Sequence, residues 1–399
     1  MIDVDEAIDR ILRLARPLPA QTVPLADAAG HFLTGPVSAH LDNPRFDASA
    51  MDGYAVRAQD QADTPLRVIG RSEAGSGFEG EVGPGEAVRI FTGAPVPNGA
   101  DAVVMQEKVQ ADGDSVRLDA APSVGQNIRR RGSDFAEGDT LIDARSLLGP
   151  AGLALMAASG HDTATVHRLP RISIISTGDE LVPIGTRPGP DQIVASNALA
   201  LTALLRPFGS HIADLGIVKD DPVVLQEAIE RALSLSDVVF TIGGASVGER
   251  DFVKPALESA GVTLDFWKLK MRPGKPLMVG NLGDKLVFGL PGNPVSALVT
   301  ARVAAIPALR ALAGSPAPRD GQRRLPLTGD LPANGFRRHF LRARTVETAD
   351  GLAVEPLLQT DSAHLTSLAA ADCLIVQAED DPGMPEGTPV SVIELNPSH

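Results

Sequence analysis

The pattern of hydrophobic and polar positions changes several times along the 399-residue chain. At the start, apolar side chains recur at helical spacing over Val4–Leu14, which predicts a helix before Pro17 and Pro19. From Asp42 to about Thr140, short runs rich in β-branched residues alternate with Gly and Pro. Short strands separated by turn signals in this way indicate a small β-rich domain.

A second helix and a strand follow the β-rich domain. Gly149–Gly160 is expected to be a short helix that ends at glycine, and Thr163–Arg168 is expected to be a strand. We interpret them as a return of the chain to the segment in which it began. The sequence therefore predicts a support domain made of residues 1–41 and 141–170, with residues 42–140 inserted into it.

From Arg171 onward, strand-like apolar runs alternate with helical segments. The predicted strands are Ile172–Ser176, Ile212–Val218 and Asp237–Ile242, the predicted helices are Ser196–Phe208 and Asp221–Leu235, and a hairpin turn is expected near Asn281–Asp284. Strands alternating with helices predict an open parallel sheet covered on both faces. We assign residues 171–318 to this α/β domain. No G-x-G-x-x-G motif follows the first strand, so a dinucleotide-binding fold is not indicated.

The last part of the chain, residues 319–399, has strand-like runs at Phe340–Glu347, Cys373–Ala378 and Val390–Glu394, and no convincing helical period. It is expected to form a small β module. The predicted fold class is a multidomain α/β and β protein. It has a central open α/β sheet, an inserted small β domain, an N-terminal support segment and a C-terminal β module.

Composition narrows the range of functions. The net charge of −14 argues against general nucleic-acid binding, which rests on a basic surface. Cys373 is the only cysteine, so intrachain disulfides and thiolate metal clusters are excluded and a reducing cytoplasm is expected. The N-terminus is acidic where a signal peptide is basic, and no apolar run approaches the roughly 18–20 residues of a membrane span. We therefore expect no membrane partner.

The stretch from Asp237 to Leu298 contains most of the candidate functional residues. A buried strand runs into Gly243-Gly244 and a loop with Ser246, and a later strand ends in Pro291-Gly292-Asn293-Pro294 before a helix that contains Ser296. Glycines let the backbone approach a ligand, and free amides at a helix start favour anions. In an open α/β sheet, such loops meet at the carboxyl edge of the strands. The sequence therefore predicts a phosphate site at this edge.

Four cations stand out against the acidic background. Lys268, Lys270, Arg272 and Lys275 fall within eight positions. Most charge runs only cover a solvated loop. Here, Pro273 and a second proline after Lys275 stiffen the segment, so we expect the cluster to contact an anionic ligand.

Three carboxylates follow three separate strands. Glu180, Asp220 and Asp251 are expected at one edge because the ends of parallel strands share it. Oxygen ligands suit a divalent cation such as Mg²⁺, which predicts a metal site. Asp221 precedes a proline and is expected to cap a helix, whereas for Asp220 a metal ligand and a solvated loop carboxylate both remain open. Asp251 also fits a cap for a helix that starts at Phe252, although its place after the glycine loop favours function.

Other polar motifs have simpler interpretations. Asn293 fits a helix cap, Arg129–Arg131 fits a solvated surface, and the neighbours of Asp52 indicate a specific turn more than catalysis. The eight histidines show no metal-ligand spacing. Ser246 and Ser296 lack a nucleophile-elbow context, so a serine hydrolase is not expected.

Seven motifs together resemble one family. In chain order they are SAMDGYA, FTGAPVP, NIRRRGSD, STGDEL, GGASVGERD, MRPGKP and GLPGNPVSA. They resemble the molybdopterin molybdenumtransferases, the insertases that complete molybdenum cofactor, whose animal relative is the C-terminal domain of gephyrin. The resemblance covers nearly the whole chain. STGDEL and GGASVG also fit molybdopterin adenylyltransferases and competence-associated proteins, so SAMDGYA and the flanking β modules favour the insertase.

The resemblance implies an activity and a set of site residues. In that family, the α/β module binds adenylylated molybdopterin, molybdate is inserted at the dithiolene, and AMP is released with magnesium present. The implied catalytic residues are Asp52, Asp134, Glu180, Asp220 and Asp251, of which Glu180, Asp220 and Asp251 would be the metal ligands. The implied substrate contacts are Thr92, Gly243, Gly244, Ser246, Lys268, Arg272, Lys275, Pro291, Asn293, Pro294, Ser296, Arg342 and Ser362.

The resemblance also implies partners. The insertases are homodimers, so Asp52, Thr92 and Asp134 are expected to reach the cleft of the partner subunit. The molybdopterin adenylyltransferase and molybdoenzymes are expected protein partners. Two alternative functions are adenylylation of molybdopterin, against which the large additional domains count, and a non-catalytic dimeric scaffold of the gephyrin type.

Two departures from the family pattern affect individual residues. Arg272 stands where many relatives carry lysine, which keeps the charge and changes its geometry. Arg342 and Ser362 match positions implied to contact molybdate. The segment before Cys373 is one residue shorter than in some relatives, so Ser362 and Ser367 compete for one role.

Overall fold

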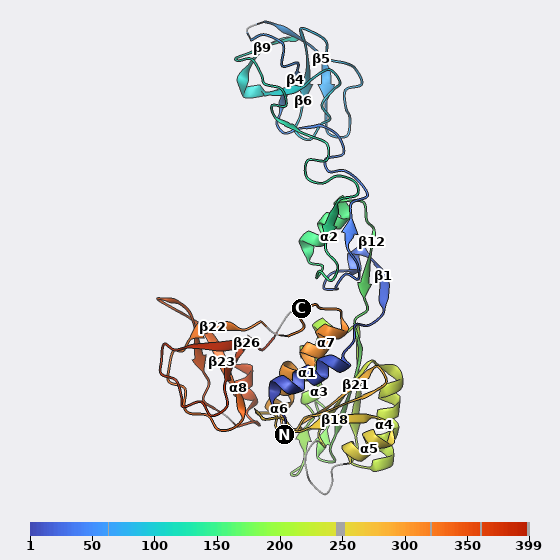
Figure 1. Cartoon of the computed structure of the whole chain (residues 1–399), viewed down its shortest axis with the longest axis vertical. Helices are drawn as coiled ribbons and strands as arrows, with labels where there is room; N and C mark the ends of the chain where they lie inside the picture. The colour runs from blue at the N-terminus through green and yellow to red at the C-terminus, as the bar shows by residue number, and fades with distance from the viewer. Residues whose placement is uncertain (63, 245–251, 320, 360, 397–399) are drawn as a thin grey trace.

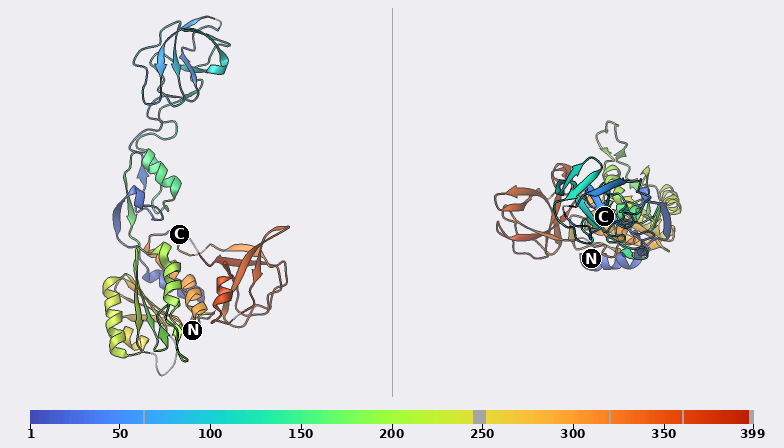
Figure 2. Two further views of the ribbon diagram at one scale, coloured as in Figure 1. Left: turned by 180° about the vertical axis from the view of Figure 1, so that it is seen from behind. Right: turned by 90° about the horizontal axis from the view of Figure 1, so that it is seen from above.

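The computed structural model describes residues 1–62, 64–244, 252–319, 321–359 and 361–396, and the predicted site residues Ser246 and Asp251 lie outside them. The molecule is elongated (Figure 1). A β-rich domain forms one end and a narrow support region continues from it. The α/β module forms the other end, with the C-terminal β module at its side (Figure 2). The predicted fold class is confirmed.

Two segments that are far apart in the sequence build the support region. Strand β1 (Ala20–Pro24) pairs antiparallel with β12 (Thr163–His167), and β2 (Val37–Ser38) pairs with β11 (Thr140–Ile142). Helix α2 (Pro150–Ala158) and the short 3₁₀ turn η1 (Leu25–Asp27) complete a small apolar core with these strands. The chain leaves the region after β2 and returns at β11.

Between β2 and β11 lies a six-stranded sheet with the order β7-β4-β6-β5-β9-β8. Its strands are β4 (Gly53–Val56), β5 (Leu66–Ser72), β6 (Glu86–Ile90), β7 (Ala102–Met105), β8 (Val109–Asp112) and β9 (Ser115–Leu118), with the turn η2 (Gln106–Lys108) after β7 and a separate pair of β3 (Ala48–Ser49) and β10 (Ile128–Arg129). Successive residues of a strand face opposite sides, and both sides are apolar here. Val56 and Val104 belong to one buried cluster, and Ala55 and Val103 belong to another.

The α/β module contains a six-stranded sheet. Its order is β16 (His211–Val218), β13 (Arg171–Thr177), β17 (Val238–Ile242), β21 (Lys285–Leu290), β20 (Met278–Leu282) and β18 (Thr263–Trp267). The first four strands are parallel, as predicted. The sheet is mixed, however, because β20 runs antiparallel to both β21 and β18. The tight link at Gly283-Asp284 between β20 and β21 imposes this, since parallel neighbours need a long crossover.

Helices cover both faces of this sheet. Ile172, Phe240 and Phe288 point to a core shared with α1 (Val4–Leu14) and α3 (Asn197–Leu205), and a 3₁₀ turn η3 (Arg206–Phe208) extends α3. Val239 and Val287 point to the opposite core, which contains α4 (Pro222–Leu235) and α5 (Val253–Ser259). The near-continuous burial of β17 follows from this double cover.

Helix α1 has the predicted bounds, but it packs on the α/β module. Val4, Ala7 and Ile11 are buried there against the helix α7 (Ile306–Leu312). The acidic first turn and Arg13 in the last turn complement the helix dipole. Ile2, just before α1, also forms a parallel β-bridge with Leu269 of the same module. The apolar core of this module therefore includes both ends of the chain.

One long helix crosses that core. It consists of α6 (Pro294–Thr300), a π-helical segment η4 (Ala301–Ala305) and α7. Pro307 explains the π segment, because a proline ring clashes with the carbonyl four residues earlier and a wider turn relieves this. Pro294–Leu312 has the length and hydropathy of a membrane span, and 94% of its most apolar window is buried inside the fold. The expectation that no apolar segment reaches this length was therefore wrong.

The C-terminal β module has the strand order β19-β23-β25-β26-β22, with β24 beside β23. Its strands are β19 (Met271–Arg272), β22 (Arg323–Pro326), β23 (Arg338–Thr348), β24 (Gly351–Pro356), β25 (Cys373–Gln377) and β26 (Pro389–Glu394). One face closes a separate core around Leu341 and Ile375, and Phe340 and Leu374 on the other face join the α/β core. A short helix α8 (Leu365–Ala369), which the sequence did not predict, also lies here.

Candidate active site

Three parallel strands end side by side and bring two glycine turns together. Gly243 follows β17 with a φ of 98°, and a Cβ atom on it would lie 2.4 Å from the carbonyl oxygen of Thr177 at the end of β13. A Cβ atom on Gly292, after β21, would lie 3.8 Å from the Cα atom of Gly243. The backbones at this edge are so close that only glycine fits at position 243. We name this the carboxyl edge.

Carboxylates gather where β13 and β16 end. The Thr177 hydroxyl donates to Asp220 Oδ1 over 2.6 Å, and the Asp220 amide donates to Asp179 Oδ1 over 3.3 Å. The Glu180 carboxylate folds back over Gly178. Two predicted metal ligands thus lie on neighbouring strand ends, and the third, Asp251, lies outside the described residues. Within those residues, no group of three or more His, Cys, Asp or Glu is close enough to hold a metal ion.

The two adjacent aspartates after β16 have different surroundings. Asp221 Oδ1 accepts from the amides of Val223 and Val224 over 2.9 and 3.0 Å, and Pro222 occupies the first position of α4. The predicted cap is confirmed. Asp220 makes no such contact and points to the end of β13 through Thr177.

The turn Pro291–Pro294 joins the carboxyl edge to the C-terminal β module. Asn293 precedes α6, but its side chain makes no capping hydrogen bond and donates to Ser362 Oγ over 2.9 Å. The interpretation of Asn293 as a side-chain cap was therefore wrong, because a partner from another module takes its amide group. Pro294 begins α6 and Ser296 is buried within it. Ser367 instead donates to the carbonyl of His364 within its own turn, so Ser362 is the serine at this edge.

Arg342 is buried on β23, with 3% of its surface exposed. Its guanidinium donates to the carbonyl oxygens of Gln359, Asp361 and His364. Burial lowers the pKa of this arginine, and the charge of Asp361 opposes that effect. The side chain thus fastens the loop that carries Ser362.

The predicted cation cluster divides into two groups. Because β18 runs in the direction of β21, its end brings Lys268 to the carboxyl edge, where the Lys268 ammonium lies 4.4 Å from the Trp267 ring centre. The φ of Lys268 is 89°, a conformation that side-chain-bearing residues rarely adopt. Lys275 is exposed at the end of the same loop. Lys270, in contrast, pairs with Asp3 over 2.9 Å.

Arg272 leaves the α/β sheet and joins the C-terminal sheet. It lies in β19, opposite His339 of β23 in a parallel pair. Burial lowers the pKa of His339 to about 4, and the charge of Arg272 adds to this. Gly274 follows with a φ of 97°, and a Cβ atom there would lie 2.0 Å from Thr300 Oγ1 of α6. The cation loop is therefore clamped between both modules.

One residue at the carboxyl edge was not predicted. Asn197 begins α3, and its side-chain amide donates to the carbonyl oxygen of Gly292 over 2.6 Å. It fixes the turn between β21 and α6 from a third element. The sequence signal was weak: a single asparagine at a helix start looks like an ordinary cap.

Asp52, Thr92 and Asp134 belong to the β-rich end and do not meet the carboxyl edge within this chain. Asp52 Oδ1 accepts from the Thr92 amide and hydroxyl over 2.7 and 2.8 Å, and these bonds hold the pKa of Asp52 below its usual value. Asp134 accepts from the Asn43 side chain over 2.8 Å. In the run Arg129–Arg131, the last two arginines pair with aspartates of the same region, and all three are exposed. This agrees with the interpretation of the run as part of the surface.

The direction of the strands explains this separation. β12 of the support region ends just before β13 begins, so the support region borders the amino ends of the parallel strands (Figure 1). Asp237 fastens this junction by accepting from Arg168 over 2.7 and 3.0 Å and from the Arg171 amide over 2.8 Å. Although burial acts to raise it, these bonds hold the pKa of Asp237 well below its usual value. The carboxyl edge lies at the opposite strand ends.

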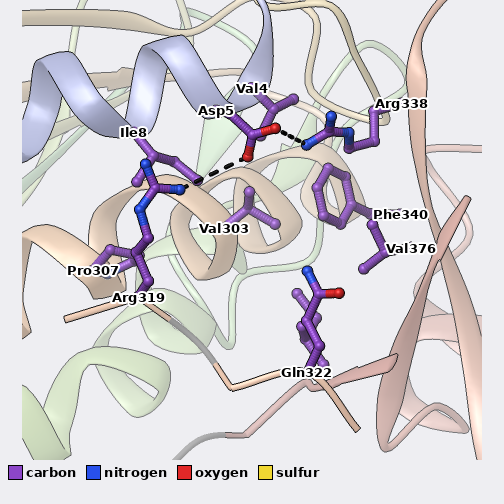
Figure 3. A pocket seen from close by; sticks show the side chains of 11 residues that line it. Val4, Asp5, Ile8, Val303, Pro307, Arg319, Gln322, Arg338, Phe340 and Val376 are labelled. Atoms are coloured by element: carbon purple, nitrogen blue, oxygen red, sulfur yellow. Dashed lines mark hydrogen bonds and ion pairs between the residues drawn. The ribbon is translucent and has the colours of Figure 1, made fainter. Parts of the chain in front are cut away.

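Three of the cavities lined by described residues lie away from the carboxyl edge. One of about 130 Å³ lies between α1, the long helix of α6, η4 and α7, the linker before β22, and the C-terminal sheet. Figure 3 shows Asp5 between Arg319 and Arg338 at this cavity. A second, of about 630 Å³, lies between the first turn of α1, Lys270 and Glu379. A third, of about 420 Å³, is apolar and lies between α3, α6 and α8.

Comparison with known proteins identifies the family of this chain. Residues 2–160 match the MoeA N-terminal region (domain I and II), residues 173–311 match a probable molybdopterin binding domain, and residues 324–395 match the MoeA C-terminal region (domain IV). Two solved structures of the molybdopterin biosynthesis MoeA protein from Pyrococcus horikoshii superpose with TM-scores of 0.84 and 0.83 at 30% and 28% identity. They cover 99% and 98% of this chain, and the chain covers 99% of each.

Curated relatives agree with the structural match. Molybdopterin molybdenumtransferase 2 of Mycobacterium tuberculosis is 37% identical, and the match covers 97% of both chains. The molybdopterin molybdenumtransferase of Bacillus subtilis is 35% identical over 98% of this chain and 94% of its own. That of Haemophilus influenzae is 40% identical over 75% of both. The chain therefore belongs to the molybdopterin molybdenumtransferase family.

Proposed function

We propose that this protein is an enzyme that inserts molybdenum from molybdate into adenylylated molybdopterin and releases AMP, as the last step of molybdenum cofactor synthesis. The observation that carries the proposal is the full-length match to relatives named for this transfer, together with a carboxyl edge built for anions. Both proposed substrates are anionic, and the edge offers a glycine turn and the cations Lys268 and Lys275.

The two ends of the carboxyl edge carry opposite charge. Asp220 and Glu180 lie at the β13–β16 end, and Lys268 lies at the β18 end. Five strand spacings separate β16 from β18, which is roughly 24 Å. That length suits an extended nucleotide-like ligand better than a single phosphate. Lys268 and Lys275 would stabilise negative charge on the ligand, and the turn at Gly243 would admit it close to the backbone.

Magnesium is proposed as the cofactor, and the donor chemistry fits it. Asp220 and Glu180 offer carboxylate oxygens, which Mg²⁺ prefers, and one or two carboxylates with waters and ligand phosphates suffice. Asp220 would keep one oxygen for Thr177 and present the other. Asp251 is proposed as a further ligand. When bound, the ion would neutralise charge on the phosphoanhydride as its bond to AMP breaks.

A homodimer is proposed, with Asp52, Thr92 and Asp134 serving the partner's site. Two observations support it. These residues lie beyond the amino ends of the strands, whereas the carboxyl edge lies at the other ends. The Asp52–Thr92 pair is also exposed, so it is open to contact from a partner subunit.

Further partners follow from the proposed reaction. The adenylyltransferase that supplies the substrate and the molybdoenzymes that receive the product are proposed protein partners, and the cytoplasm is the proposed location. Adenylylation of molybdopterin by this chain is not favoured, because its full-length relatives are named for molybdenum transfer.

The decisive experiment measures AMP release from adenylylated molybdopterin with and without molybdate. Molybdate-dependent release supports the proposal. Formation of the adenylylated pterin from ATP without such release would identify an adenylyltransferase, and neither activity in a well-folded dimer would favour the scaffold function.

The same assay tests the cation loop. Lys275→Ala should weaken substrate binding and make the remaining affinity less sensitive to salt, because one exposed charge contact is lost. Lys285→Ala is the matched control, since its ammonium donates to the Ser236 carbonyl at the opposite edge of the sheet. Equal salt dependence in the two variants would assign Lys275 to a solvated loop.

A further inference from the structure

Arg89 occupies an unusual place in the β-rich domain. It lies on β6 directly opposite Tyr54 of β4, and its guanidinium is 5.0 Å from the ring centres of both Tyr54 and Phe91. It donates to the Gly53 carbonyl over 3.2 Å and to the Gln106 side chain over 2.5 Å. One side chain thus contacts β4 and the turn after β7 as well as its own strand. No motif of the sequence analysis includes it.

The contacts of Arg89 surround Asp52. Gly53 and Tyr54 follow Asp52 directly in SAMDGYA, and Phe91 precedes its hydrogen-bond partner Thr92 in FTGAPVP. A third bond joins the Asp52 carbonyl to the Gln106 amide over 3.1 Å. The Arg89 guanidinium therefore contacts the residues that follow Asp52, the residue before Thr92, and the Gln106 side chain, whose amide binds the Asp52 carbonyl.

The turn at Asp52 has little freedom to adjust on its own. A Cβ atom on Gly53 would lie 1.9 Å from the carbonyl oxygen of Val104, so the backbone presses against β7. Arginine suits the position because its planar group stacks on both rings while it donates in its own plane. A lysine keeps the charge but offers neither the plane nor the paired donors. The positive charge of Arg89 also acts to lower the pKa of Asp52.

We infer that Arg89 is a positioning residue that fixes the Asp52–Thr92 pair for its role in the active site. The inference rests on the proposed function, in which this pair serves the partner's site. Arg89 itself touches no substrate. It determines where the Asp52 carboxylate lies through contacts with β4, with Phe91 at the end of β6 and with the turn after β7.

A double-mutant cycle in the full-length dimer tests the inference. The variants are Arg89→Met, Asp52→Asn and the combination, with kcat and KM for adenylylated molybdopterin and the melting temperature measured for each. Arg71→Met is the matched control. Arg71 is the register neighbour of Arg89 on β5, but it is exposed, and its ion pair among the described residues is with Glu73 over 3.4 Å.

Arg89→Met should lower kcat on the order of 10- to 100-fold, as expected when a reacting group is misplaced by about 1 Å. In the Asp52→Asn background, the same change should have no further effect on kcat. Arg89→Lys should behave like Arg89→Met, whereas Arg71→Met should match the wild type. Arg89→Lys also covers the case in which the methionine variant does not fold.

The outcomes distinguish a failure of the proposed role of Asp52 from a failure of the role of Arg89 alone. If Asp52→Asn keeps wild-type kcat, the proposed role of Asp52 fails and this inference fails with it. If Asp52→Asn loses activity while Arg89→Lys keeps it, only the inference is overturned. Additive losses in the double variant would also overturn it, because Arg89 would then act independently of Asp52.

Discussion

At the residue scale, neighbouring side chains of the same type have separate duties at the carboxyl edge. Asp221 accepts two amides of α4, and Asp220 accepts the hydroxyl of Thr177 at the next strand end. The cap of Asp221 is local and independent of any ligand. Asp220 is oriented across two strands, which a merely solvated carboxylate does not require.

Substitution at the two positions should therefore have opposite signatures. Asp221→Ala should lower the stability by about 1 kcal/mol, the usual cost of losing such a cap, and keep most of the turnover. Asp220→Asn keeps an acceptor for Thr177, so it should fold normally, lose most AMP release and need more magnesium. Melting curves and a magnesium titration of AMP release measure both effects.

Glu227→Gln, on the exposed face of α4, controls for loss of charge near this end of the sheet. Wild-type turnover and magnesium dependence in Asp220→Asn would make Asp220 a loop carboxylate. An unchanged melting temperature in Asp221→Ala would contradict the cap.

Sequence reasoning found the local features of the site and missed the long-range ones. The glycine turns, the Asp221 cap and the cation run are signalled by neighbours in the chain. The contact of Asn293 with Ser362, and that of Asn197 with Gly292, join distant segments. No local pattern distinguishes such an asparagine from a helix cap. Nor did any local signal show that Lys270 pairs with Asp3.

At the element scale, the short strand β19 couples the cation loop to the C-terminal β module. It pairs in parallel with β23, so Arg272 and His339 are register neighbours. The bounds of α1 and, closely, those of β13, β16 and β17 could be predicted because each has its own apolar pattern. The pairing of β19 could not, because a two-residue strand has no period, and α8 is too short to show one.

The environment of His339 predicts acid sensitivity of this junction. Its folded pKa of about 4 lies below the usual 6.5 because of burial and the charge of Arg272. The unfolded chain therefore binds more protons between these values, so stability should fall as the pH drops from about 6.5 to 4. Each pH unit is worth about 1.4 kcal/mol, which gives a loss of roughly 3 kcal/mol.

Urea unfolding at several pH values measures this loss. His339→Gln should flatten the profile, because glutamine does not titrate in this range. His364→Gln is the control, since that side chain is exposed on the same module. A parallel decline in the wild type and His339→Gln would show that other groups cause the acid sensitivity.

The first turn of α1 forms a second junction with the C-terminal β module. Asp5 pairs with Arg338 over 2.8 Å and with Arg319 over 3.7 Å (Figure 3). Asp9 also contacts Arg319. Most of these groups are exposed, so each pair alone contributes little, and the cluster matters as a set that fixes one orientation.

Asp5→Asn should loosen this junction without unfolding either module. Trypsin should cleave after Arg319 several times faster than in the wild type, because Arg319 loses one of its two carboxylate partners. About 1 M salt should accelerate cleavage of the wild type more than that of the variant, which keeps only the Asp9 pair of Arg319, since screening then acts over about 3 Å. Glu6→Gln, which removes only a pair within α1, should cleave like the wild type. Equal cleavage of Asp5→Asn and Glu6→Gln would contradict the anchoring role.

At the scale of the whole molecule, the support region determines which residues one chain can bring together. It holds the β-rich domain beyond the amino ends of the strands, and Asp237 with Arg168 fastens its base. Because of this separation, Asp52, Thr92 and Asp134 are candidates for the active site of a partner subunit. The alternation of strands and helices predicted the α/β module, but it did not predict the direction in which the support region extends from it.

Complementation tests the shared site. Asp52→Ala and Asp220→Ala should each be inactive as pure dimers. Co-expression should restore about a quarter of the wild-type activity, because half of randomly formed dimers are mixed and each mixed dimer has one intact site. Co-expressed Asp220→Ala and Glu180→Ala, which damage the same end of the carboxyl edge, should restore none. A fully active monomer in sedimentation would exclude the shared site.

The core of the α/β module, which includes both ends of the chain, has a consequence for synthesis. Val4 and Ile11 share that core with Leu309 and Leu312, so α1 emerges from the ribosome about 300 residues before its partners. At about 5–20 residues per second, that delay is roughly 15–60 s. The β-rich domain closes within residues 48–129 and can fold during this time. The nascent chain therefore carries a folded β-rich domain while the apolar side of α1, with Val4, Ala7 and Ile11, is still uncovered, which makes this side a contact for a chaperone.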